Sequence, residues 1–200
     1  MVQEEINYAV FGLGNPGKEY LTSRHNIGFW VVDYLEKQYK TSQKRIECFA
    51  VTWLAALPPA QHVLFVKPAT FMNLSGKAVG QIVQKYALPL NRILILHDDL
   101  DLPFLQIRIK NRGQSGGHRG VESIIQSLHT DLFARLKIGI GRPGMYEDPV
   151  EYVLSSFSKK EQQEIINRMP DLRDAVESWL ESGFHHTANR FNRKNTVDDE

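Results

Sequence analysis

The sequence has little cysteine and no long apolar segment. Its one cysteine, Cys48, excludes an internal disulfide and a metal site built from several cysteines. No apolar run approaches the ~18 residues that a transmembrane helix needs. The acidic start, MVQEEINYAV, lacks the basic residues and apolar core of a signal peptide. We therefore expect a soluble, cytoplasmic protein.

The chain also lacks a strong charge of one sign, since its formal net charge is +1. The charges are nevertheless unevenly distributed. Residues 1–146 hold 17 Lys/Arg against 11 Asp/Glu, and residues 147–200 hold 7 against 12. The stretch from Leu102 to Gly120 has four basic residues and no acidic one. A solvated face is the plain interpretation of such a run, but a basic strip can also follow a phosphate backbone.

Short apolar runs alternate with helical patterns along most of the chain. We predict strands over residues 6–14, 48–57, 62–68, 92–99, 105–110 and 135–141, and helices over 27–39, 74–88, 121–128 and 159–185. This alternation is typical of an α/β fold: a single-domain sandwich with a mixed, mostly parallel twisted sheet flanked by helices. Residues 1–191 are expected to form one catalytic domain, and residues 192–200 a polar, disordered tail.

Residues 12–17 spell G-x-G-x-x-G, the spacing of a dinucleotide-binding turn. Such a site needs a helix that begins within the glycines and an acidic residue about 20 residues further on, after the second strand. Here the helical pattern begins only near Asn26, and the acids at the right distance, Asp33 and Glu36, lie inside that helix. We therefore expect the glycines to turn the chain so that Asn15 faces a cleft.

A second glycine-rich stretch, GQSGG at residues 113–117, matches the nucleophile pattern G-x-S-x-G around Ser115. Asp131 and His185 or His186 follow in the order of that hydrolase class. The nucleophile turn must rise directly from a buried strand, however, and the two residues before this stretch are polar. The pattern therefore favours a backbone nest for an anion, with a serine nucleophile as the lesser alternative.

The sequence HDDLD, residues 97–101, ends a predicted buried strand, where α/β enzymes place their sites. Three carboxylates could bind Mg²⁺, but no fourth oxygen ligand is identifiable from the spacing. A single carboxylate can instead orient a histidine and stabilise its charged form. We assign this role to Asp98, regard Asp99 and Asp101 as loop or capping residues, and expect no metal.

Taken in series, these motifs resemble the bacterial peptidyl-tRNA hydrolases in order and spacing. The stretches are GLGNPG with RHNIG, KPATFMNLSG, HDDLDLP, SGGHRG, and RLKIGIGRPG with VEYVLSSF. The resemblance runs from about Tyr8 to Phe157 and continues more weakly through the C-terminal helix. It implies hydrolysis of the ester that joins a peptide to the terminal ribose of tRNA, which recycles tRNA from peptidyl-tRNA released early by ribosomes.

The resemblance also implies roles for individual residues. His25 matches the catalytic histidine, and Asp98 the carboxylate that keeps it in its basic form. Asn15 matches the asparagine linked to choosing N-blocked over free aminoacyl ends, Asn73 a substrate-binding amide, and Tyr20 a tRNA-contacting position. The other implied binding positions are Phe71 and Met72, which form an apolar wall beside the amide, and Asn26, Gly117, His118 and Arg119.

These residue types suit ester hydrolysis on chemical grounds alone, independently of the family resemblance. A water must lose a proton near neutrality, and the unperturbed histidine pKa of ~6.5 suits that task. A positioned base is typically worth ~10²–10⁴ in rate, and an amide aimed at the oxyanion ~10²–10³. The plain alternatives are that Asn73 only caps the following helix and that His25 is a surface residue.

One position departs from the commoner family pattern. His-Asn-Gly is replaced by His118-Arg119-Gly120, so that an amide becomes a guanidinium, which only donates hydrogen bonds and is always charged. We infer that Arg119 contacts a phosphate or a backbone carbonyl of the acceptor end.

The basic strip then has a use. Arg108, Lys110 and Lys137 lie on adjacent predicted strands, and Arg142 lies on the loop after the second strand. We predict that they contact tRNA phosphates without reading sequence. Residues 142–149, with the helix beginning near Val150, are expected to form a lid over the cleft.

Three alternatives remain open. A plant organellar relative of the same fold acts as a splicing cofactor, so a non-catalytic RNA-binding role is the main competitor. A serine hydrolase using Ser115 comes next, and a dinucleotide-dependent enzyme last. We expect a monomer with peptidyl-tRNA as its partner, and no cofactor, membrane association or stable protein partner.

Overall fold

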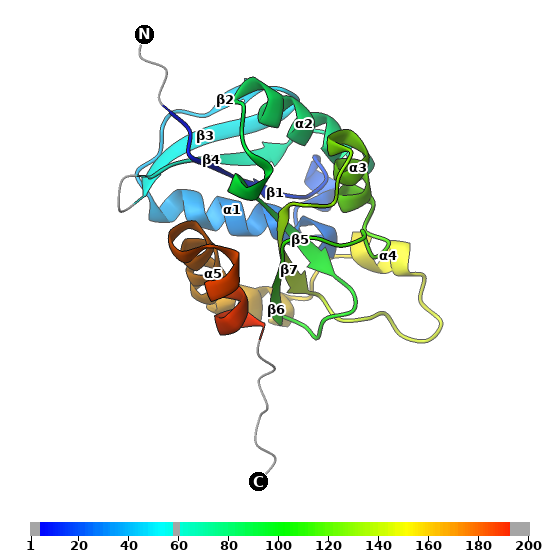
Figure 1. Cartoon of the computed structure of the whole chain (residues 1–200). Helices are drawn as coiled ribbons and strands as arrows, with labels where there is room; N and C mark the ends of the chain where they lie inside the picture. Colours follow the sequence, from blue (N-terminus) through cyan, green and yellow to red (C-terminus); the bar gives the residue numbers. More distant parts are fainter. Residues whose placement is uncertain (1–4, 58–60, 193–200) are drawn as a thin grey trace.

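The computed structural model describes residues 5–57 and 61–192 as an α/β sandwich (Figure 1). Its sheet has the strand order β2-β3-β4-β1-β5-β7-β6. The central strands β4, β1, β5 and β7 are parallel, and β2, β3 and β6 are added antiparallel at the two edges. The strands span Tyr8–Gly12 (β1), Arg45–Glu47 (β2), Ala50–Leu57 (β3), Gln61–Pro68 (β4), Ile93–Asp99 (β5), Ile107–Lys110 (β6) and Ala134–Gly139 (β7).

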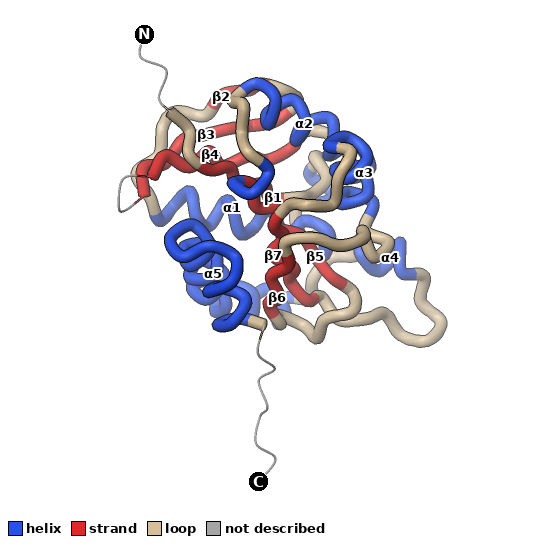
Figure 2. Tube along the Cα trace, in the orientation of Figure 1, coloured by secondary structure: helices blue, strands red, loops and turns tan. Residues whose placement is uncertain are grey.

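Helices cover both faces of the sheet (Figure 2). One face packs against α1 and α5, and the other against α2 and α3. The helices span Ile27–Gln38 (α1), Ser75–Lys85 (α2), Arg119–Leu128 (α3), Pro149–Leu154 (α4) and Lys159–Phe191 (α5), and short 3₁₀ helices span Lys18–Tyr20, Arg24–Asn26, Met72–Leu74 and Leu90–Arg92. None of the helices in these ranges is long and apolar enough to cross a membrane.

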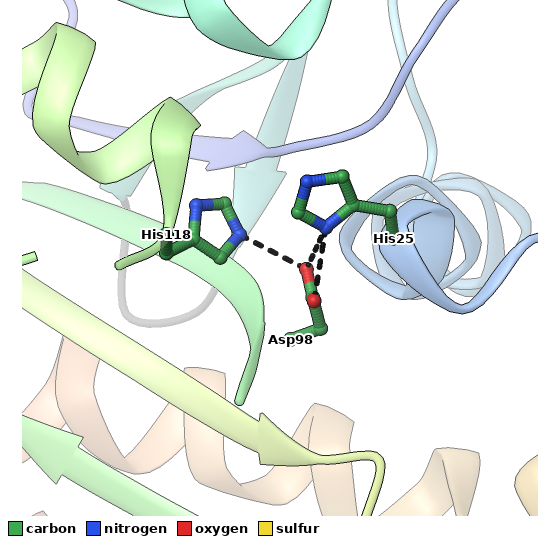
Figure 3. Close-up of side chains that lie close together, drawn as sticks. All are labelled: His25, Asp98 and His118. Atoms are coloured by element: carbon green, nitrogen blue, oxygen red, sulfur yellow. Dashed lines mark hydrogen bonds and ion pairs between the residues drawn. The ribbon is translucent and has the colours of Figure 1, made fainter. Parts of the chain in front are cut away.

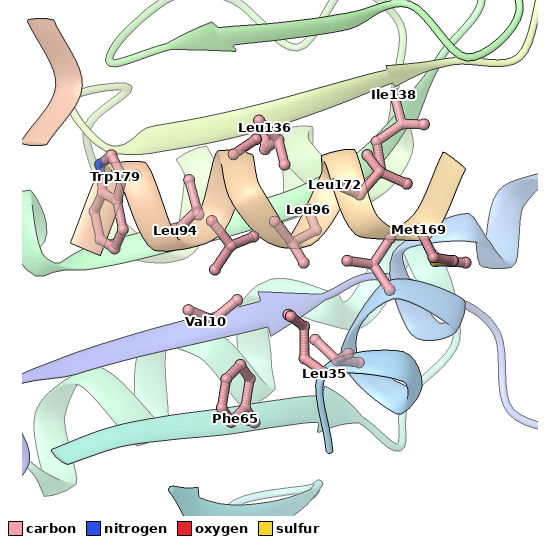
Figure 4. Close-up of a cluster of buried hydrophobic side chains, with 14 of the residues drawn as sticks. Val10, Leu35, Phe65, Leu94, Leu96, Leu136, Ile138, Met169, Leu172 and Trp179 are labelled. Atoms are coloured by element: carbon pink, nitrogen blue, oxygen red, sulfur yellow. The ribbon is translucent and has the colours of Figure 1, made fainter. Parts of the chain in front are cut away.

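The parallel strands are apolar on both faces because both are covered. In β5, Leu94 and Leu96 face α1 and α5, whereas Ile93 and Ile95 face α2 and α3. Figure 4 shows the first of these layers, where Trp179 and its neighbours on α5 lie against the sheet. Burying each such large side chain contributes about 1.5–3 kcal/mol, so the two layers fix the strands whose ends carry the site.

The fold class and nearly all elements predicted from the sequence are confirmed. The strand predicted from residue 48 begins at Ala50, because Cys48 and Phe49 form a turn with positive φ. The short strand β2 was not predicted. The last helix runs beyond the predicted residue 185 to Phe191, with a break at Gly183, whose φ is 73°.

The last described residue binds the edge strand β6 of the sheet. Asn192, placed in the predicted tail, accepts a hydrogen bond from Ile109 N (2.7 Å) and donates one to Ile109 O (2.9 Å). One side-chain amide therefore satisfies the backbone of the edge strand β6 as a neighbouring strand would. The rest of the predicted tail, residues 193–200, lies outside the described residues.

Candidate active site

The carboxyl ends of the parallel strands meet at one edge of the sheet, where the loops after β1, β4, β5 and β7 surround a cleft of about 920 Å³. This is where an open parallel sheet places its ligands. The cleft is lined by Asn15, Tyr20, His25, residues 71–73, 98–101, 115–119, 142–145, Glu147, Pro149, Val150, Val153 and Leu154.

At the base of the cleft a buried carboxylate lies between two histidines. Asp98, at the end of β5, is 2% exposed. Its Oδ1 and Oδ2 lie 2.8 and 2.9 Å from Nδ1 of His25, and Oδ1 lies 2.9 Å from Nε2 of His118. Figure 3 shows the two rings approaching the carboxylate from opposite sides, His25 from before α1 and His118 from before α3. Three residues far apart in the sequence thus form one hydrogen-bonded unit.

The hydrogen-bond partners fix the protons of both rings. Nδ1 of His118 accepts from the backbone N–H groups of Gly120 (3.1 Å) and Val121 (3.2 Å), so the proton of this ring is on Nε2 and is donated to Asp98. Nδ1 of His25 likewise donates to the carboxylate, which leaves Nε2 of His25 with a free lone pair. His118 is therefore both the N-cap of α3 and a support for Asp98.

Burial alone would raise the pKa of Asp98, but the two facing imidazoles hold it well below its usual range. Asp98 is thus a carboxylate throughout the physiological pH range. Such a group keeps a neighbouring imidazole in one tautomer and stabilises the imidazolium that forms when the ring takes up a proton. The same three residues lie close enough together to hold a metal ion, and their N···O distances of 2.8–2.9 Å are those of hydrogen bonds.

His97 lies directly behind this unit. Its ring meets that of His118 edge to face, with the ring centroids 4.6 Å apart and an interplanar angle of 72°, and its Nδ1 donates to Asp98 O. Burial, followed by the proximity of His118, holds the pKa of His97 well below its ordinary value. His97 is therefore a neutral packing partner of His118.

The loop before α1 is fixed by a glycine and an asparagine. A Cβ on Gly28 would lie 2.4 Å from Leu96 O, so only glycine lets the start of α1 approach β5 this closely. Asn26, 2% exposed, binds the backbone of Asn15 from both sides: Oδ1 accepts from Asn15 N (2.8 Å) and Nδ2 donates to Asn15 O (2.9 Å). The structure thus gives Asn26 a supporting position rather than a place on the cleft wall.

The amide of Asn15 is aimed by this arrangement. Its Oδ1 accepts from Met72 N (2.7 Å), which leaves the Nδ2 donors for the cleft. Asn73 lines the same cleft from the 3₁₀ helix Met72–Leu74. The N-cap of α2 is Leu74, without a side-chain hydrogen bond, so the alternative in which Asn73 caps this helix is wrong. Phe71 is 54% exposed beside it, whereas Met72 is buried beneath.

Of the four basic residues predicted to bind phosphate, Arg142 lines the cleft, and the other three lie on the strands β6 and β7. Arg108 and Lys137 are direct partners across β6 and β7, and Lys110 follows on the same face of β6. Two of the basic residues already have acidic partners: Lys137 pairs with Asp99, and Arg142 with Asp101 at 2.5 Å. The sequence did not indicate these pairs, because the acids were interpreted as loop or capping residues.

The two competing motifs lack their required surroundings. Helix α1 begins ten residues after Gly17, so its N-terminus cannot meet a pyrophosphate held by the glycines. Ser115 lines the cleft, but both nitrogens of the neighbouring His118 are occupied, and Asp131 accepts instead from Gly113 N. His185 lies on α5, which covers the opposite face of the sheet from α3.

Comparisons with known proteins agree with this geometry. A family model described as peptidyl-tRNA hydrolase matches residues 9–199. The chain belongs to the peptidyl-tRNA hydrolase family. It is 43% identical to the peptidyl-tRNA hydrolase of Persephonella marina over 187 residues, which cover 93% of this chain and 97% of the relative. It is 41% identical to that of Aquifex aeolicus over 188 residues, covering 94% and 97%. The crystal structure of the Acinetobacter baumannii peptidyl-tRNA hydrolase has a TM-score of 0.85 and 30% identity, covering 95% of this chain and 97% of that one.

The resemblance identified from the sequence is thereby confirmed, and the chain is an enzyme, a hydrolase of this family. Sequence reasoning also missed the attachment of the His25 loop to the start of α5 through Arg24. The only signal was the position of this arginine directly before the histidine.

Proposed function

We propose that this enzyme hydrolyses the ester between a peptide and the terminal ribose of tRNA, with His25 as general base and Asp98 as the group that orients it. The observation that carries this proposal is the buried Asp98, which holds Nδ1 of His25, while Nε2 has no hydrogen-bond partner at the cleft among the described residues. Since peptidyl-tRNA released from ribosomes is a cytoplasmic molecule, this function places the enzyme in the cytoplasm.

In the reaction, Nε2 of His25 removes a proton from water, and the hydroxide adds to the ester carbonyl carbon. Asp98 stabilises the imidazolium formed, as in other carboxylate–histidine pairs. The Nδ2 donors of Asn15 and Asn73 stabilise the oxyanion, an effect worth roughly 10²–10³ in rate for one donor. The tetrahedral intermediate then expels the ribose oxygen, which takes the proton back from His25.

Charge in the cleft accounts for selection of N-blocked substrates. Asn15 and Asn73 offer amide donors, and Arg119 adds a positive charge to the same wall. A neutral peptide amide accepts these donors, whereas the ammonium of a free aminoacyl-tRNA meets donors and a like charge. Arg119 contacts a phosphate or carbonyl of the acceptor end. An Arg119→Asn variant should raise KM and lower its salt dependence, and an unchanged KM would contradict this role.

The acceptor end lies along Arg108, Lys110, Lys137 and Arg142. Phosphates neutralised by these residues release counterions, so binding weakens steeply with salt, by a logarithmic slope of about −0.7 to −0.9 per contact. Because Lys137 and Arg142 are already paired, the larger losses are expected from Arg108→Ala and Lys110→Ala. A flat salt profile would argue against the strip.

The first experiment is the release of labelled N-acetyl-aminoacyl groups from tRNA by the wild type and by His25→Ala. The matched control is His186→Ala, because His186 is an exposed histidine on α5. We expect fast release from the blocked substrate only, lost in His25→Ala and kept in the control. Binding of tRNA without release would favour the non-catalytic RNA-binding alternative. Release that survives His25→Ala would return attention to Ser115.

A further inference from the structure

Arg24, the residue before His25, has a guanidinium that makes hydrogen bonds, an ion pair and contacts with two aromatic rings. Nη1 and Nη2 of Arg24 bind the two carboxylate oxygens of Glu161 at 2.7 and 3.2 Å, and Nε donates to Ser155 Oγ at 3.3 Å. The guanidinium carbon Cζ of Arg24 lies over the rings of Tyr152 and Phe157, 4.5 and 5.0 Å from their centroids. The side chain is 11% exposed. This is a built site for one arginine, not a surface ion pair.

The backbone around Arg24 is attached to the same segment. Arg24 N donates to Ser155 O (3.0 Å), and Phe157 N donates to Thr22 O (2.8 Å). Ser23 and Ser156 form an isolated antiparallel bridge. The chain just before His25 is thus paired with the chain that joins α4 to α5.

Glu161, the residue that Arg24 binds, is itself held in place at the start of α5. Glu161 is the third residue of α5 and closes a capping box: it accepts from Ser158 N at 2.7 Å, while Ser158 Oγ accepts from Glu161 N at 3.2 Å. Burial alone would raise the pKa of Glu161, but the hydrogen bonds from Arg24 and Ser158 hold it below its ordinary value. A carboxylate in this first turn also suits the positive end of the helix.

We propose that Arg24 is a positioning residue for catalysis, which holds the His25 ring in line with Asp98 by tying the 3₁₀ helix Arg24–Asn26 to the start of α5. This inference rests on the proposed role of His25 as general base. Among the described residues, the ring of His25 makes its hydrogen bonds through Nδ1, so the direction of Nε2 depends on where the backbone of residues 24–26 is held. Small shifts of a base away from its reacting geometry are costly to rate.

Lysine cannot replace this arginine. An ammonium has no planar fork for two carboxylate oxygens and no flat face to lie over the two rings, although it keeps the charge. Arg24→Lys therefore keeps the positive charge but removes the paired hydrogen bonds to Glu161 and the contacts with the rings. Glu161→Gln is a milder second variant, which keeps Arg24 and removes the negative charge that it binds.

The test compares kcat, KM and thermal stability of the full-length enzyme for wild type, Arg24→Lys and Glu161→Gln, with Arg168→Lys as control. Arg168 lies on the same helix and pairs with Asp171 in a half-exposed i,i+3 contact. We expect kcat to fall at least tenfold in Arg24→Lys and about threefold in Glu161→Gln, with KM changed less than kcat. Arg168→Lys should match the wild type.

A second readout reports His25 directly. The Nδ1–H resonance of His25, shifted downfield by Asp98, should broaden or move in Arg24→Lys and stay in place in Arg168→Lys. Normal kcat and an unchanged resonance in folded Arg24→Lys and Glu161→Gln would overturn the proposal, even if both variants melt at lower temperature. If His25→Ala is fully active, the general-base assignment fails instead, whatever Arg24→Lys does.

Discussion

His118 caps α3 with one ring nitrogen and binds the buried carboxylate of Asp98 with the other. The resemblance places it among substrate-binding positions, whereas the structure shows both of its nitrogens bound within the protein. The variant His118→Asn separates its two structural contacts. Asparagine is among the best N-caps, so its Oδ1 can still accept from Gly120 and Val121, but it is too short to reach Asp98.

The magnitude follows from the lost contact. A hydrogen bond to a buried charge contributes about 1.5–3 kcal/mol, and 1 kcal/mol corresponds to roughly 2–4 °C in Tm for a chain of this size. His118→Asn should therefore lower Tm by about 3–12 °C. His118→Ala also loses the cap, which costs about 1 kcal/mol more. If the same bond holds Asp98 in its productive orientation, kcat falls about 10- to 100-fold in both variants.

The assay is steady-state release of N-acetyl-aminoacyl groups at saturating and limiting substrate, at a temperature where each variant is folded by circular dichroism. Lower kcat with nearly constant KM supports a role through Asp98. Raised KM with wild-type kcat would refute this reasoning and support direct contact with substrate. Equal stability of the Asn and Ala variants would refute the capping part.

Three further outcomes follow from the structure. The pKa of Asp98 is lower in the folded state than in the unfolded chain, where it is about 3.9. The carboxylate therefore stabilises the fold above about pH 4, and this contribution is lost as the pH falls further. In urea unfolding, the stability difference between wild type and Asp98→Asn should shrink below about pH 4. Gly28→Ala should destabilise by about 3 kcal/mol or more, because its Cβ would meet the backbone of Leu96, and a melting temperature like that of the wild type would contradict this packing. Asn192→Ala should cost about 1–3 kcal/mol and increase light scattering on heating, because it leaves Ile109 on the edge strand unpaired; unchanged scattering would show that the edge is protected in another way.

The fold could be predicted because its signals are local. Runs such as ILIL in β5 are apolar at every position, which is typical of a strand covered on both faces, and the helices follow at regular intervals. The strand β2 could not be predicted: it has three residues, two of them charged, and it exists only because β3 lies beside it. The last helix breaks at Gly183, whose φ of 73° lies in the left-handed region that glycine adopts readily.

The site was predictable to the extent that its residues lie at the ends of predicted strands and helices. His25 lies in the segment after β1, and Asp98 lies at the end of β5. The two could be expected to meet, because the carboxyl ends of parallel strands lie at the same edge of a sheet. The second partner of Asp98 could not, since nothing in SGGHRG indicates that the histidine caps α3 with one nitrogen and binds the carboxylate with the other. Pairing of Lys137 and Arg142 with acids was hidden for the same reason: it depends on side-chain positions across two loops.

The arrangement around Asp98 explains why so many of the supporting residues lie outside the cleft. A buried carboxylate is costly unless every oxygen is bound, and a base must also keep one nitrogen free for water. These demands are met by fixing the backbone rather than by adding contacts to the rings: Gly28 sets the start of α1, and the first turn of α3 sets His118. Arg24 belongs to the same class, because it acts on the chain that carries His25 and touches neither the carboxylate nor the cleft. Substitutions at such positions should therefore alter kcat more than KM, whereas substitution of Arg119, which lines the cleft, should alter KM more than kcat.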